Sequence, residues 1–244
     1  MIDLRDISIR YGERSIFKGF SQTFSKGKIH ILLGPSGCGK TSLLKAMSGL
    51  LKPEIGRIFL NGKDIDTIHG KEKIKYFALM FQNPCLLPHI RAKDNILFPG
   101  KIIRLAPKDL KDRLTRLCQM VRLEEHHLNK YPAQLSGGER QRVSLMRSLL
   151  LSPPIIFMDE PLSALDPLVR HALLVDLKKV FKKLGHTIVL VTHDLREASY
   201  LGDHIYLIQE GKIVQDGTFS DLYQNPKTEF TKRFITSQMP GTHD

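Results

Sequence analysis

The sequence has no tryptophan, only three cysteines and no apolar run close to the ~20 residues that span a bilayer. Cys38, Cys85 and Cys118 lie far apart without the spacing of metal ligands. Because an odd number cannot all pair, this usage predicts free thiols in a reducing compartment. The first residues, 1–5, do not begin a secretory signal. We therefore expect a soluble, cytosolic chain without a membrane span.

The composition sets a second limit. The 244 residues, 41% hydrophobic and 25% charged, suffice for one large or two small globular lobes. A formal net charge of +12 raises nucleic acid or an anionic membrane surface as partners. The basic residues, however, fall in amphipathic clusters such as 71–75 and 178–183, where helical spacing turns charge outward. Solvated faces near acidic lipid headgroups explain this charge, and we expect no nucleic acid partner.

A glycine-rich loop follows the apolar run Ile29–Leu33. It has the pattern G-x-x-x-x-G-K-[ST] and, with the next residue, consists of Gly34, Pro35, Ser36, Gly37, Cys38, Gly39, Lys40, Thr41 and Ser42. Its glycines let phosphates approach backbone N–H groups and allow positive φ. Lys40 then reaches the β and γ phosphates, and Thr41 offers its hydroxyl to Mg²⁺. The pattern predicts a site for ATP and Mg²⁺. For Cys38, a redox-sensitive thiol and a small residue that fits the loop both stay open.

A second apolar run, Ile155–Met158, ends in Asp159 and Glu160. A buried parallel strand delivers carboxylates to the edge of a sheet in this way. Asp159 is placed to hold Mg²⁺, and Glu160 to polarise the water that attacks the γ phosphate. The alternative is a solvated helix start before Pro161, which the phosphate loop makes the weaker interpretation.

The segment 135–142 lies between these motifs and reads Leu-Ser-Gly-Gly-Glu-Arg-Gln-Arg. With it the chain resembles, from Met1 to about Ile235, the nucleotide-binding subunit of ATP-binding cassette (ABC) transporters. The resemblance implies that Ser136, Gly137 and Gly138 contact the γ phosphate held by another subunit, so that a head-to-tail pair encloses two ATP molecules. Ser136 is also placed to cap the helix that follows, a role compatible with anion binding.

Four further residues match motifs of this family. The resemblance implies that Tyr11 stacks on adenine, Gln82 contacts Mg²⁺ or the attacking water, His193 contacts the γ phosphate and Asp166 lies in a loop that crosses to the other subunit. The alternatives are a half-buried strand-end tyrosine for Tyr11 and a structural histidine for His193. His193 follows the apolar run 187–191, one strand-helix-strand unit after the acid pair, which favours the functional role.

The predicted fold class is α/β, a P-loop NTPase core of the ABC type with an antiparallel β subdomain and an inserted helical subdomain. Residues 1–82 and 136–235 would form the nucleotide-binding core, 83–135 the helical subdomain and 236–244 a polar tail. The later part of the core would contain a crossover helix over 167–184 and a hairpin across Glu210 and Gly211.

The resemblance implies ATP hydrolysis that powers solute import through a separate transmembrane permease. Its partners would be a second copy or a homologous cassette, the permease and a solute-binding protein, and its place the cytoplasm, peripheral on the inner face of the cell membrane. Segment 160–166 resembles importers, and 192–203 with the tail resembles the osmoprotectant and quaternary-amine group or the nitrate, sulfonate and taurine groups. The apolar loop Leu86–Ile90 either packs in the helical lobe or receives a coupling helix of the permease.

Other classes remain as alternatives. An exporter subunit usually carries Thr-Gly-Asn where this chain has residues 162–164. A soluble ABC ATPase acting on ribosomes or nucleic acid typically has a second cassette or a coiled-coil insertion, and neither is present. A P-loop kinase or GTPase lacks the 135–142 segment. Because only a short polar tail follows Phe234, we expect no regulatory domain of the kind that sugar or glycine betaine subunits often carry, which weakens the osmoprotectant assignment. The sequence does not identify the solute.

Overall fold

The computed structural model describes residues 1–163 and 165–239. Ala164, part of the motif that contains Asp166, and residues 240–244 of the expected tail lie outside the described residues. The chain divides into two compact units, the first formed by Met1–Ile68 with the chain from Thr187 onward and the second by His69–His186. None of the described helices is long and apolar enough to cross a bilayer.

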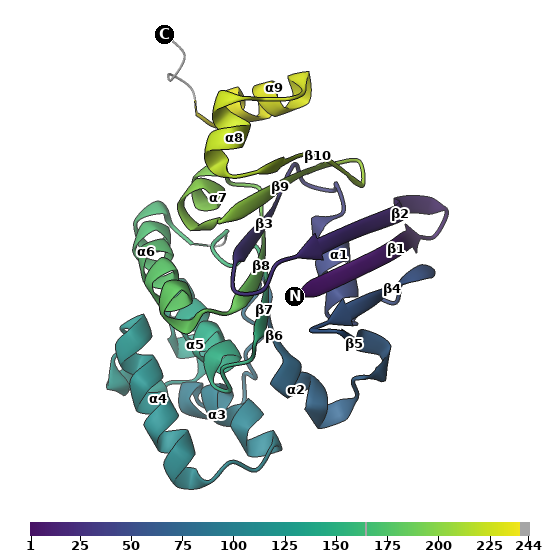
Figure 1. Cartoon of the computed structure of the whole chain (residues 1–244). Coiled ribbons are helices and arrows are strands. Elements are labelled where there is room, and N and C mark those ends of the chain that lie inside the picture. The colour runs from purple at the N-terminus through teal and green to yellow at the C-terminus, as the bar shows by residue number, and fades with distance from the viewer. Residues whose placement is uncertain (164, 240–244) are drawn as a thin grey trace. The chain divides into compact units, whose positions relative to one another are not determined.

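The first unit contains an antiparallel sheet with the strand order β2-β1-β4-β5 (Figure 1). In β1 the buried positions change parity: Ile2 and Leu4 are buried, then Ile7 and Ile9. The switch occurs at a register shift that contains Asp6, whose φ is 53°. A bulge turns the strand so that both pairs face the same core. The strands of this sheet are Ile2–Tyr11 (β1), Arg14–Phe24 (β2), Ile55–Leu60 (β4) and Lys63–Asp64 (β5), followed by a 3-10 turn at Ile65–Thr67.

The first unit also contains four strands in the order β10-β9-β3-β8. Strand β3 pairs parallel with β8 on one side and β9 on the other, and all residues of β3 and β8 are buried, as expected for parallel strands covered on both faces. The expected hairpin is confirmed, since β9 and β10 pair antiparallel across Glu210 and Gly211. The bounds are Ile29–Leu33 (β3), Thr187–Thr192 (β8), His204–Gln209 (β9) and Lys212–Gly217 (β10), with helices Lys40–Met47 (α1), Leu195–Leu201 (α7), Phe219–Gln224 (α8) and Glu229–Gln238 (α9).

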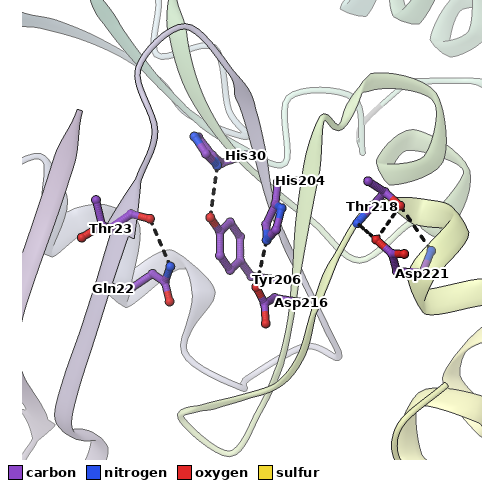
Figure 2. A network of polar contacts seen from close by, with 8 residues as sticks. All are labelled: Gln22, Thr23, His30, His204, Tyr206, Asp216, Thr218 and Asp221. Atoms are coloured by element: carbon purple, nitrogen blue, oxygen red, sulfur yellow. Dashed lines mark hydrogen bonds and ion pairs between the residues drawn. The ribbon is translucent and has the colours of Figure 1, made fainter. Parts of the chain in front are cut away.

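A buried polar cluster anchors the start of β3 (Figure 2). The Nε2 of His30 lies 2.8 Å from the carbonyl of Ser25, which accepts only, so Nε2 carries the proton and Nδ1 accepts from the Tyr206 hydroxyl at 3.3 Å. Burial lowers the pKa of His30, and burial with nearby Asp216 raises the pKa of Tyr206 to about 12. Both groups therefore stay neutral at physiological pH, and the cluster fixes the strand that leads into the glycine-rich loop.

The second unit pairs strand β6 in parallel with β7 and surrounds them with helices (Figure 1). Helix α5 packs against α3, α4 and α6. The apolar stripe of α4, formed by Leu110, Leu114, Leu117 and Val121, is buried. The elements are Gly70–Glu72 (η2), Lys73–Tyr76 (α2), Phe77–Met80 (β6), Ala92–Ile102 (α3), Pro107–Val121 (α4), Glu125–Asn129 (η3), Pro132–Gln134 (η4), Gly137–Leu149 (α5), Ile155–Asp159 (β7) and Pro167–Leu184 (α6). The predicted crossover helix is thus confirmed.

Candidate functional site

The glycine-rich loop connects β3 to α1, and its three glycines have positive φ: 153° at Gly34, 79° at Gly37 and 106° at Gly39. A Cβ on Gly34 would lie 2.3 Å from the carbonyl oxygen of Ile208, and one on Gly39 would lie 2.5 Å from a methyl of Ile16. A Cβ on Gly37 would meet nothing within 4 Å. Gly34 and Gly39 are therefore needed because other parts of the chain pass close to them, a reason that the sequence did not reveal, whereas Gly37 faces open space.

Lys40 is folded into this loop and is only 4% exposed. Its ammonium donates to the carbonyls of Gly34 and Pro35, both at 2.8 Å, and lies 3.9 Å from the Cys38 sulfur. Lys40 is the first residue of α1, so the positive end of that helix lies beside the same charge. Thr41 and Ser42 follow in the first turn, half-buried. A cation and a helix N-terminus in one glycine-rich loop suit a polyphosphate with its Mg²⁺.

Substitutions at two glycines of this loop should separate its contribution to stability from its contribution to nucleotide binding. Gly34→Ala is expected to lower the free energy of unfolding by about 3 kcal/mol, because the methyl group collides with a backbone carbonyl at a strained φ. Gly37→Ala should cost about 1 kcal/mol, since only the backbone conformation resists it, while it weakens nucleotide binding. Urea denaturation and titration with ATP measure the two effects. Equal stability of the two variants would contradict this account of the loop.

Two further candidate residues lie in the first unit. Tyr11 is the last residue of β1 and is 50% exposed, which fits both a ring that stacks on adenine and the half-buried strand-end tyrosine of the alternative interpretation. His193 is exposed in the turn between β8 and α7. Its backbone carbonyl accepts a hydrogen bond from the Gln238 side chain at 2.9 Å. Neither position is explained by packing into a core.

The acid pair lies in the second unit, at the end of β7. Asp159 is buried as the last residue of the strand, and Glu160 is half-buried with a φ of 43°. Neither Asp159 nor Glu160 starts a helix; among the described residues the next helix, α6, begins at Pro167. The helix-start alternative is therefore wrong. A glutamate in the left-handed region is strained, and such strain collects at functional sites. No group of three metal-ligating side chains of the His, Cys, Asp or Glu type occurs among the described residues.

Gln82 is joined to the acid pair by two hydrogen bonds. Its side-chain amide donates to the Ser163 hydroxyl at 3.0 Å, and that hydroxyl donates to the Glu160 carbonyl at 3.1 Å. The motif that contains Asp166, the end of β7 and the glutamine are thus brought together in one unit. Ser163 was not a candidate residue in the sequence, because a serine in a loop carries no pattern of its own.

Side chains of helix α5 donate hydrogen bonds to the backbone carbonyls of the loop after β6. The Gln141 amide donates to the Gln82 carbonyl at 3.0 Å, and the Ser144 hydroxyl donates to the Pro84 carbonyl at 3.3 Å. The guanidinium of Arg147 donates to the carbonyls of Pro84 at 2.7 Å and Cys85 at 2.8 Å. Burial lowers the pKa of Arg147. Sequence reasoning missed all three side chains, although their spacing of three residues puts polar groups along one side of a largely buried helix.

The 135–142 segment forms the start of α5 as expected. The Ser136 hydroxyl accepts from the Glu139 N–H at 3.3 Å, and the Glu139 carboxylate accepts from the Ser136 N–H at 2.9 Å, which is a capping box. Burial alone would raise the pKa of Glu139, but the Ser136 N–H, His127 and Lys130 leave it below its ordinary value. Ser136 itself is exposed, and a Cβ on Gly138 would lie 2.7 Å from Val169.

Asp166 and the apolar loop complete the candidate set. Asp166 caps α6, because its carboxylate accepts from the N–H groups of Leu168 and Val169 at 3.2 and 3.1 Å. In the loop Leu86–Ile90, the backbone of Leu87 bonds to the side chain of buried Asn95. The side-chain amide of Asn95 accepts from the Leu87 N–H at 2.7 Å and donates to the Leu87 carbonyl at 3.0 Å. Leu86, Leu87 and Ile90 are half-buried, whereas Pro88 and His89 are exposed. The loop therefore packs partly in the lobe and partly faces outward.

The phosphate loop between β3 and α1, the acidic end of β7 and the capped helix α5 define a P-loop cassette. The model of the ABC transporter family matches residues 17–163, more than half of the sequence, and the chain belongs to that family. The predictions of family and of fold class are thereby confirmed. Among solved structures, the dimeric ATP-binding cassette MJ0796 in a post-hydrolysis state with ADP and Pi has a TM-score of 0.80 and 29% identity. The match covers 90% of this chain and 99% of that one.

Curated relatives are similar over nearly the whole chain. The spermidine/putrescine import ATP-binding protein PotA of Pasteurella multocida (strain Pm70) is 37% identical over 235 residues, which are 96% of this chain and 63% of the relative. The choline transport ATP-binding protein OpuBA of Bacillus subtilis (strain 168) is 38% identical over 239 residues, 96% of this chain and 62% of the relative. The chain therefore spans a little under two thirds of the length of these relatives.

Proposed function

We propose that the chain hydrolyses ATP and thereby powers the import of a small organic solute, such as an osmoprotectant, through a separate transmembrane permease. ATP and Mg²⁺ are the cofactors. The phosphates lie in the loop from Gly34 to Ser42, with Lys40 beside them, and adenine stacks on Tyr11. Thr41, Gln82 and Asp159 would hold the metal, and a bound Mg²⁺ would supply positive charge beside the phosphates. Glu160 is the general base, and His193 contacts the γ phosphate.

The observation that carries this proposal is the conformation of the phosphate loop. A buried strand leads into it, three glycines adopt positive φ, and Lys40 lies in the loop at the start of a helix. Mg²⁺ in such sites takes one or two protein carboxylates plus oxygens of the substrate phosphates, so it needs no cluster of three protein ligands. The relatives named above are import ATP-binding proteins, which supports transport as the purpose of hydrolysis and does not favour action on nucleic acid or ribosomes.

We propose that the chain acts in a pair with a second copy or a homologous cassette. Ser136, Gly137 and Gly138, at the exposed start of α5, then contact the γ phosphate bound to the partner, and Asp166 lies in the segment that crosses between subunits. Leu168, two residues beyond Asp166, is 84% exposed, as an apolar residue kept for an interface would be. The similar solved structure, the cassette MJ0796, is dimeric, which supports this arrangement.

The partner in the membrane would bind the helical subdomain, for which we keep the bounds 83–135 within a cassette of residues 1–235. This part of the second unit has a groove of about 1060 Å³ between α3, α4 and η3. Leucines form its floor and cations its rim, among them Leu97, Leu110, Leu114, Lys93, Arg104 and Lys111. The groove and the exposed tip of the loop Leu86–Ile90 offer surface for a permease. The chain would lie in the cytoplasm, on the inner face of the cell membrane, in a complex that includes a solute-binding protein.

The proposed function is tested with the purified full chain. Phosphate release from Mg²⁺-ATP is measured alongside sizing chromatography with and without ATP. We expect hydrolysis that stops when Mg²⁺ is chelated, together with a shift toward a dimer in ATP. If the chain neither binds nor hydrolyses ATP, the proposal is wrong. Hydrolysis by a chain that stays monomeric at all concentrations would contradict the role given to Ser136.

A further inference from the structure

Gln238, the last residue of α9, makes two hydrogen bonds to the backbone of the turn that contains His193. Its amide nitrogen donates to the His193 carbonyl at 2.9 Å, and its amide oxygen accepts from the Leu195 N–H at 2.7 Å. A carbonyl only accepts and a backbone N–H only donates, so these partners fix the orientation of the amide without ambiguity. Both polar ends of one side chain are thus used on backbone groups two residues apart.

Hydrogen bonds between neighbouring residues also shape this turn. Asp194 caps α7 by accepting from the N–H groups of Arg196 and Glu197, at 2.7 and 3.3 Å. The Thr192 hydroxyl accepts from the Asp194 N–H at 3.1 Å and donates to the buried Glu197 carboxylate at 2.6 Å. The contact from Gln238 comes from far along the chain, 45 residues from His193 and 43 from Leu195. Local bonds shape the turn, and Gln238 fixes the peptide groups on both sides of Asp194.

Helix α9 is itself held firmly enough to act as an anchor. The Thr228 hydroxyl caps its start by accepting from the Thr231 N–H at 3.1 Å. Thr231 and Ile235 are buried, and α9 contacts α8. At the other end, the N–H of Met239 donates to the Ile235 carbonyl at 3.0 Å. The position of Gln238 therefore follows that of α9.

We propose that Gln238 is a positioning residue for His193: it sets the backbone from which the imidazole reaches the γ phosphate, so that a displacement of α9 changes the catalytic rate. This inference rests on the proposed function, because it assumes that His193 acts on a bound nucleotide. His193 is exposed directly after a fully buried strand, so a shift of its backbone would move the ring with it. A small misplacement of a group that contacts the reacting phosphate lowers the rate strongly.

Two variants separate the two hydrogen bonds. Gln238→Leu removes both, whereas Gln238→Glu keeps an oxygen for the Leu195 N–H and loses the donor to the His193 carbonyl. Gln224→Leu is the matched control, because Gln224 is an exposed glutamine at the end of α8 that makes no such bond. Exchange of the Leu195 amide hydrogen, read by NMR in the full chain, should accelerate at least about tenfold in Gln238→Leu and stay slow in the other two.

The kinetic test uses the same variants. In Gln238→Leu and Gln238→Glu we expect kcat to fall about tenfold while KM changes less than about twofold, because positioning affects the reaction rather than binding. In a His193→Ala background, Gln238→Leu should cause no further loss. If the Leu195 amide stays protected in Gln238→Leu, Gln238 does not hold this turn in solution. If Gln238→Leu lowers kcat as much in the His193→Ala background as in the unaltered chain, Gln238 does not act through His193. An unaltered chain without ATP hydrolysis would instead show that the proposed function is wrong, whatever the amide exchange.

Discussion

Glu160→Gln is expected to lower kcat for ATP hydrolysis by about 1000-fold and to leave ATP affinity unchanged, because only the proton acceptor for the attacking water is lost. Glutamine has the shape of glutamate and can keep the same left-handed backbone. The hydrogen bond from Ser163 reaches the backbone carbonyl of residue 160, so the substitution does not disturb it. The variant should therefore fold like the unaltered chain and accumulate as an ATP-bound dimer on a sizing column.

Glu210→Gln is the matched control for this experiment. Glu210 also has a left-handed backbone, with a φ of 47°, but lies in the turn between β9 and β10. Its replacement should leave both kcat and the elution volume unchanged. If Glu160→Gln hydrolyses ATP within about threefold of the normal rate, Glu160 is not the base, since general base catalysis contributes at least about 100-fold.

Lys40→Ala is expected to weaken ATP binding by about 10- to 150-fold, since a hydrogen bond to a charged group is worth about 1.5–3 kcal/mol. Lys40 also closes the loop on itself through the carbonyls of Gly34 and Pro35. Its removal therefore takes away a charge for the phosphates and loosens the loop that presents the backbone N–H groups. Titration with a fluorescent ATP analogue measures the affinity, and circular dichroism confirms the fold.

Lys45→Ala is the control for Lys40→Ala. Lys45 lies on the same helix, half-buried in its last turn, and makes no bond to the loop carbonyls. The Lys45→Ala variant should bind ATP with the affinity of the unaltered chain. If Lys40→Ala binds ATP as tightly as Lys45→Ala does, the lysine does not contact the phosphates in the bound state.

Much of the fold could be predicted because the sequence marks its element ends clearly. The bounds of α6 follow from Asp166 and Pro167 at one end and Gly185, with a φ of 62°, at the other. Runs of apolar residues located β3, β7 and β8, since strands buried on both faces leave an uninterrupted pattern. The switch in β1 from buried even-numbered residues to buried odd-numbered residues could not be predicted. It occurs at a bulge around Asp6, where the pairing of β1 with β2 and with β4 shifts in register.

The candidate site was predicted as a set of motifs, but not as a set of contacts. The motifs located the loop around Lys40, the acid pair and the start of α5. They did not reveal Ser163, Gln141 or Gln238, because each of these bonds to a backbone carbonyl, which every residue possesses. A sequence pattern depends on the identity of side chains. A hydrogen bond to a main-chain carbonyl places no requirement on the side chain of the residue that accepts it, so such a bond cannot be predicted from that residue.

The way in which α5 holds the loop after β6 has an evolutionary consequence. Gln141, Ser144 and Arg147 bind the carbonyls of residues 82, 84 and 85 and ignore the side chains there. These bonds therefore keep the path of the main chain whichever side chain stands at the exposed position 85. A replacement there would change the surface that this loop presents to a partner without any change in α5.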